Sequence, residues 1–265
     1  MKKFSVIFLS LFLISTFTLI VHADYASDYQ NYINQTGTYN AAHDAYLTAR
    51  ATYIASGSID SQDKAIQATS QMLQSRDAVF INYLTAIRTK LSSTVGINST
   101  DQSSLTGQIN TEISWYQNHA SRIPSASTLN DLVNDSNEAQ DQYKSSTLDL
   151  IYRSLITIGA ANNSFIRGEL SNEITTLSAK IDEIKANQDK DVTVVSRSLI
   201  DVQDKISRSE SKDSDAVNNI NSAKPNDNQL DNDFEDSQSN LSDSNSYLKE
   251  ANQEMLQIIA EIKSN

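Results

Sequence analysis

Apolar residues, with two serines among them, recur in a strict four-three alternation near the end of the chain. The positions with this spacing are Leu230, Phe234, Ser237, Leu241, Ser244, Leu248, Ala251, Met255, Ile258 and Ile262. The same alternation covers residues 170–184 and 192–206, and a further stripe with seven-residue spacing runs from Ile59 to Thr94. A heptad repeat places one stripe of each helix against a partner helix and is typical of coiled-coil-like packing. The spacing therefore predicts an all-α fold built from elongated up-and-down helical bundles.

Glycine and proline mark where these helices end. Gly57 and Gly96 follow long helical patterns, and Pro124 and Pro225 lie between such patterns. Together with the apolar spacing they predict about six helices, at roughly 25–56, 60–94, 101–122, 127–188, 191–223 and 228–263. Two helix starts match the capping-box pattern, at Ser99-x-x-Gln102 and Thr128-x-x-Asp131. No run of alternating β-branched residues bounded by turns predicts a strand.

The fourth helix, residues 127–188, organises the rest. It contains no proline, and its middle, from Thr147 to Ala161, is apolar around most of its circumference, which is typical of a helix buried on several sides. We therefore expect two bundles that share this helix: an N-terminal four-helix bundle over 24–160 and a C-terminal three-helix bundle over 161–265. Gly159, near the junction, permits either a close helix approach or a bend.

The C-terminal bundle carries the more polar sequence. Residues 207–245 are rich in Ser, Asp and Asn, which compete for backbone hydrogen bonds and are poor helix formers. We expect fraying around 208–230, and we expect Asp227 to cap the last helix.

The first residues have the pattern of a secretory signal peptide. Met1-Lys2-Lys3 precedes an uncharged stretch from Phe4 to Val21, and Val21-His22-Ala23 ends it with an A-x-A-like site. This pattern predicts that residues 1–23 are removed. Because the uncharged stretch approaches the roughly 20 residues of a membrane-spanning helix, a retained anchor is the alternative. Either form places the protein outside the cytoplasm, secreted or at the cell surface.

Composition narrows the possible chemistry. The chain has no cysteine and a formal net charge of −12. Disulfides, thiolate zinc sites and cysteine nucleophiles are thereby excluded, and the negative charge repels nucleic acid and anionic lipid. No stretch after Val21 is apolar for long enough to span a bilayer. We expect protein partners at the cell envelope, no nucleic-acid partner and no membrane insertion after signal cleavage, and we leave the oligomeric state open.

A tyrosine stripe on the first helix is the candidate interaction site. Its members are spaced seven apart: Tyr25, Tyr32, Tyr39, Tyr46 and Tyr53. Such rings can form an exposed platform for a glycan or peptide. They more commonly pack in a helix interface, where the ring is buried and the hydroxyl reaches the rim. We expect the packing role and keep the platform as the alternative.

Other candidate sites lack part of their pattern. His43 and His119, the histidines that follow the signal segment, do not have the i, i+4 spacing of a helical zinc pair. The acidic run from Asp231 to Asp236 resembles half of a calcium loop but lacks the turn glycine and the distal glutamate. No G-x-S-x-G nucleophile turn and no glycine-rich phosphate loop occurs. We therefore expect no enzyme, no cofactor and no metal site.

The segment Arg76–Leu91, preceded by the tyrosine-rich first helix, resembles uncharacterised exported helical-bundle proteins of candidate-phylum (Patescibacteria-type) bacteria. The resemblance covers residues 24–125 and rests on heptad positions. It implies a bacterial cell-surface setting and transfers no site residue. Our leading hypothesis is a non-enzymatic structural spacer or protein-interaction module. The alternative is a small-ligand or glycan-binding protein with a cleft beside the tyrosine stripe, and an enzyme ranks third.

Overall fold

The computed structural model describes residues 23–186, 192–225 and 229–264, and within these ranges the chain is almost entirely helical with no strand. The all-α fold is thus confirmed. The helices are α1 (Ala23–Ser56), α2 (Ile59–Ser93), α3 (Ser99–Arg122), α4 (Leu129–Gln142), α5 (Leu148–Ala186), α6 (Thr193–Ser222) and α7 (Leu230–Ser264). A short 3-10 turn, η1 (Ile123–Ser125), precedes α4, and a π-helical turn, η2 (Tyr143–Thr147), joins α4 to α5.

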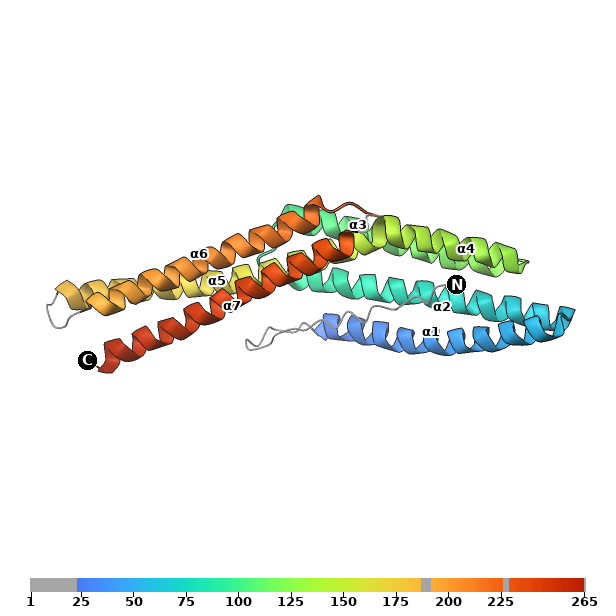
Figure 1. Cartoon of the computed structure of the whole chain (residues 1–265), viewed down its shortest axis with the longest axis horizontal. Coiled ribbons are helices and arrows are strands. Elements are labelled where there is room, and N and C mark those ends of the chain that lie inside the picture. The colour runs from blue at the N-terminus through green and yellow to red at the C-terminus, as the bar shows by residue number, and fades with distance from the viewer. Residues whose placement is uncertain (1–22, 187–191, 226–228, 265) are drawn as a thin grey trace.

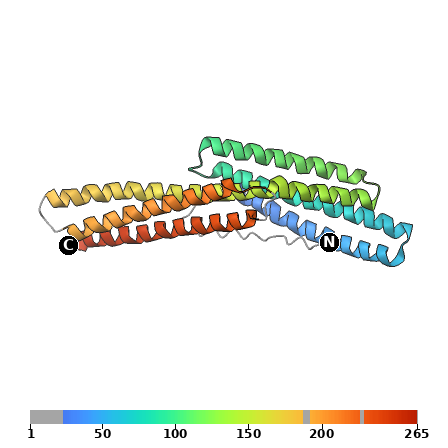
Figure 2. The same ribbon diagram turned by 45° about the horizontal axis from the view of Figure 1, so that its top comes forward.

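The molecule is long and narrow, with its helices gathered at two ends (Figure 1). Helices α1 to α4 lie at one end, and α5, α6 and α7 form the other. The predicted long helix is present as α4, η2 and α5, which follow one another without a break and connect the two ends (Figure 2). Within η2 the backbone N–H of Leu148 donates to the carbonyl of Tyr143, a π-type bond that adds one residue to the turn. The apolar pattern did not predict this insertion.

Local signals explain most helix starts and stops. Gly57, with φ of 61°, forms the left-handed turn between α1 and α2, and Ser58 caps α2. Thr128 and Asp131 form the predicted capping box at α4. The predicted box at Ser99 is wrong: Asn98 caps α3 by accepting from the N–H of Thr100 at 2.8 Å. Asp227 lies outside the described residues.

Helix α1 forms an outer layer of the N-terminal half. It packs along α2, and α2 in turn packs against α3, α4 and α5. Because α1 hardly contacts the rod formed by α4, η2 and α5, it joins the N-terminal half mainly through α2. The outward face of α1 accordingly leaves Ile33, Leu47 and Ile54 exposed.

The C-terminal half packs through the predicted heptad positions. In α7, Phe234, Leu248, Met255 and Ile258 are buried, and so are the seam residues Ser237 and Ser244. We expected fraying around 208–230, and within that range α6 is an unbroken helix through Ser222, so the expectation is wrong for this part. The reason is that its polar seam residues have partners across the interface, as when the hydroxyls of Ser209 and Ser244 lie 2.9 Å apart.

Gly159 serves close packing. The helix α5 continues through it, and a Cβ added there would lie 2.6 Å from Cδ1 of Leu241 on α7. No helix among the described residues has the length and apolarity needed to cross a membrane.

Candidate functional site

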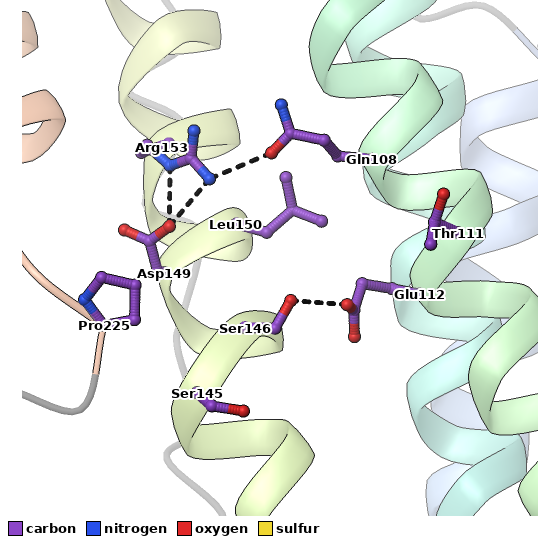
Figure 3. Close-up of a pocket in the computed structure, with 9 residues that line it drawn as sticks. All are labelled: Gln108, Thr111, Glu112, Ser145, Ser146, Asp149, Leu150, Arg153 and Pro225. Atoms are coloured by element: carbon purple, nitrogen blue, oxygen red, sulfur yellow. Dashed lines mark hydrogen bonds and ion pairs between the residues drawn. The ribbon is translucent and has the colours of Figure 1, made fainter.

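A small pocket lies where the two ends of the molecule meet, and we call it the junction pocket (Figure 3). Its volume is about 280 Å³. Helix α3, the turn η2, the first turns of α5 and the connection after α6 each contribute to its wall. The lining residues are Gln108, Thr111, Glu112, Ser145, Ser146, Asp149, Leu150, Arg153 and Pro225.

Glu112 is a buried acid of this pocket, with 4% of its surface exposed. Its Oε1 accepts from Ser146 Oγ at 2.5 Å, and its Oε2 accepts from Thr147 Oγ1 at 2.8 Å. Gln142 Nε2 donates to both oxygens, at 2.9 and 3.0 Å. All three partners lie in or directly before η2, so the π turn directs two consecutive hydroxyls at one carboxylate. The carboxylate is therefore saturated by neutral donors.

Arg153 closes the opposite wall. Its Nε and Nη2 atoms bind Asp149 Oδ2 at 2.9 and 2.8 Å, and Nη2 also donates to the Gln108 side-chain oxygen at 3.1 Å (Figure 3). Asp149 is one helical turn before Arg153 on α5, so the pair is formed within one helix and anchored to α3 through Gln108. Each titratable group that lines the junction pocket thus has a partner.

Arg153 and Gln108 also line a larger groove of about 540 Å³, which we call the junction groove. It runs between α3, α5 and α6 and begins at Gly96, whose positive φ of 91° and close approach to the Ala161 carbonyl bring the α2–α3 turn onto α5. Its walls carry the hydroxyl or amide groups of Asn98, Ser104, Gln108, Thr157, Ser164, Ser214, Asn218 and Asn221. This lining suits polar, hydrogen-bonding ligands.

A buried polar layer forms the floor of the junction groove. Asp213 on α6 accepts from Arg167 Nη1 at 2.7 Å and from Asn163 Nδ2 at 2.9 Å, both on α5. The same amide group of Asn163 donates to the Leu241 carbonyl at 3.2 Å. The layer links three helices and fixes their register, as buried polar pairs do in helical bundles.

The tyrosine stripe lies in the interface between α1 and α2. Tyr46 is buried with 8% of its surface exposed, and Tyr25, Tyr32, Tyr39 and Tyr53 are half-buried. The rings of Tyr32 and Tyr83 lie 4.9 Å apart, and Lys90 lies over the Tyr25 ring at 5.3 Å. Burial raises the pKa of Tyr25, Tyr32 and Tyr39 above the ordinary value. None of the five lines the junction pocket or the junction groove, so neither hollow is the cleft beside the stripe that the alternative hypothesis requires.

The two histidines differ in their surroundings. His43 lies in the α1–α2 interface between the rings of Tyr39 and Tyr46. His119 is buried, and its Nδ1 lies 2.5 Å from Oδ2 of the fully buried Asp77. Its Nε2 donates to the Asp135 carbonyl at 3.0 Å, because a carbonyl oxygen only accepts. The members of this cluster come from three helices, so the spacing of residues along one helix does not reveal it.

The acidic run at the start of α7 packs against α5. Tyr152 donates its hydroxyl to Asp231 Oδ1 at 2.9 Å, and its ring stacks on Phe234 with a centroid separation of 3.9 Å. Burial, followed by the contact with Asp231, raises the pKa of Tyr152. Asp231 therefore has a role in packing that the half-matched calcium pattern did not suggest.

Comparison of the chain with protein-family models, with curated proteins and with solved structures finds no match.

Proposed function

We propose that the chain is an exported, non-enzymatic helical spacer or protein-interaction module that works at the cell surface or outside the cell. The observation that carries this proposal is the rod of α4, η2 and α5, which connects the two ends of the molecule and packs against other helices at both. At 1.5 Å per residue such a rod is about 90 Å long, so it can hold two contact surfaces far apart.

The chemistry of the junction pocket supports the same proposal. A catalytic acid must donate a proton to a substrate, and a catalytic base must have a lone pair free to accept one. The Glu112 carboxylate instead accepts hydrogen bonds from Gln142, Ser146 and Thr147, and Arg153 is paired with Asp149. These contacts hold helices together, which is the role of a structural module.

The export part of the proposal is tested by cell fractionation with N-terminal sequencing of the native protein. The expected product starts at Asp24 and is found in the medium or on the cell surface. A product that still contains residues 1–23 at the surface would indicate a tethered stalk. Recovery of the full-length chain from the cytoplasm would contradict the proposal.

The interaction part is tested by cross-linking in intact cells followed by mass spectrometry. A module predicts reproducible cross-links from one surface of the chain to the same envelope protein. Substitution of apolar residues on that surface should then abolish these cross-links while the thermal stability stays unchanged. Cross-links that occur only within the chain would argue against a protein partner.

A ligand-binding function is the second candidate, and the junction groove is the observation that favours it. A hollow of about 540 Å³ with both polar and apolar lining residues falls in the size range of small-ligand sites. Ser164→Trp would fill the groove from an exposed position on α5. A glycan or small polar ligand that raises the melting temperature of the parent but not of the Ser164→Trp variant would support this function. A shift of equal size in both proteins would exclude the groove.

A further inference from the structure

Three metal-ligating side chains meet near the turn between α3 and α4. His119 lies in the last turn of α3, and Asp135 and Glu138 lie one turn apart on α4. One ligating atom from each of the three lies within 4.8 Å of the other two. Metal sites in helical bundles are built from side chains on facing helices, and two ligands of one helix can come from positions i and i+3.

His119 is held in the orientation that a metal ligand needs. Its ring stacks on Trp115 with a centroid separation of 5.0 Å and an angle of 9°. Asp77, which is fully buried on α2, holds the Nδ1 side of the ring at 2.5 Å. The Nε2 side therefore faces α4, where it donates to the Asp135 carbonyl. A carboxylate on one nitrogen and a metal on the other is the usual surrounding of a metal-bound histidine.

We propose that His119 Nε2 and the carboxylates of Asp135 and Glu138 bind a divalent transition metal ion, with Zn²⁺ as the best match. One imidazole and two carboxylates form a three-ligand set that Zn²⁺ accepts, with water at the fourth position. Calcium and magnesium favour oxygen ligands alone, so the buried imidazole discriminates against them. Asp77 is a positioning residue, because it acts on the ion only through the His119 ring.

Two contacts change when the ion binds. The hydrogen on Nε2, which now points at the Asp135 carbonyl 3.0 Å away, leaves to solvent. Nε2 and that carbonyl must also move apart, and the freed lone pair then binds the ion. Arg122, which lies 2.7 Å from Glu138 Oε1, must release that carboxylate. Both partners of this ion pair are well exposed, at 55% and 44%, so the pair can open without unfolding the helices. Arg122 is therefore a competitor of the metal ion.

The test is a Zn²⁺ titration of the full chain in competition with a chromophoric chelator, in buffer freed of trace metals. Glu138→Gln removes a ligand and should weaken Zn²⁺ binding by about tenfold or more. Arg122→Gln removes the competitor and should tighten it by about two- to fivefold. The opposite signs separate a metal site from a purely structural ion pair, since loss of either partner breaks that pair equally.

Matched controls use the same helix and the other histidine. Asp141→Asn, an exposed change of charge on α4, and His43→Gln should both leave the affinity unchanged. His119→Gln should abolish binding, and the two exposed variants, Glu138→Gln and Arg122→Gln, decide the matter if that buried change prevents folding. Absence of Zn²⁺ binding in the parent, or equal affinity in the parent and Glu138→Gln, would overturn the proposal.

Discussion

Leu241 on α7 lies so close to Gly159 on α5 that a side chain at position 159 would collide with it. A Cβ at 159 would lie 2.6 Å from Cδ1 of Leu241, and the other atoms that it would meet belong to the same leucine. The absence of a side chain at position 159 thus leaves room for the Leu241 side chain between α7 and the rod. Because Leu241 also offers its carbonyl to Asn163, this approach brings the buried polar layer within bonding distance.

Gly159→Ala should destabilise the protein by about 1–2 kcal/mol, because Leu241 must leave its rotamer or the helices must separate. Alanine is the better helix former, so a loss of stability would come from tertiary contact alone. Gly168→Ala is the matched control on the same helix: a Cβ there meets nothing within 4 Å. It should stabilise the protein by about 0.5–1 kcal/mol. Urea unfolding measures both, and equal signs would contradict the packing role.

Tyr46 and Leu47 are neighbours in sequence that face opposite environments. Tyr46 has 8% of its surface exposed in the α1–α2 interface, whereas Leu47 has 47% exposed. Tyr46→Ala should cost about 3 kcal/mol of unfolding free energy through lost burial and a cavity. Leu47→Ala should change it by no more than about 0.5 kcal/mol. If Tyr46→Ala were as mild as Leu47→Ala, the stripe would be free for binding and the platform alternative would gain support.

Glu112 should contribute to stability through the donors that it satisfies. Glu112→Ala leaves Gln142, Ser146 and Thr147 without their acceptor and should cost about 3 kcal/mol. Glu112→Gln keeps one acceptor oxygen and should cost about 1 kcal/mol. Thr111 lines the same pocket from an exposed position, so Thr111→Ala serves as the control. It should change the free energy of unfolding by no more than about 0.5 kcal/mol. Urea midpoints that do not separate Glu112→Ala from Thr111→Ala would rule this role out.

Tyr143 should make the protein sensitive to alkaline pH. Burial, followed by the nearby Asp231 carboxylate, raises the pKa of Tyr143 from 10.0 to about 12. Between these values the folded state holds a proton that the unfolded state has lost, so the free energy of unfolding falls as pH rises from about 10 to about 12. Below about pH 10 the contribution is fully present.

Tyr143→Phe cannot ionise, so its stability should fall less steeply across that window. Asp231→Asn should lower the pKa of Tyr143 and reduce the same loss in part. Urea unfolding of the parent and both variants at about pH 9, 10, 11 and 12 gives the slopes. A slope in Tyr143→Phe identical to that of the parent would mean that Tyr143 does not carry the effect.

Much of the fold was readable from the sequence, for a local reason. A heptad pattern indicates which face of each helix is buried. Gly57 indicates where the chain turns after α1, and the Thr128–Asp131 box indicates where α4 begins. Each of these signals acts over a few residues, so the chain carries it without reference to its neighbours. The predicted stripe on α7 and the long rod follow from them.

Tertiary structure alone decided what covers each face. The tyrosine stripe predicts that α1 packs against another helix, but it does not identify that helix as α2. The hydrogen bonds that stabilise Ser209 and Asp213 come from α5 and α7, so composition alone wrongly predicted fraying. Asp77, His119 and the α4 acids lie on three helices, and the π turn at η2 brings Ser146 and Thr147 to Glu112. The spacing along one helix fixes directions around its own axis, whereas these sites depend on distances between helices.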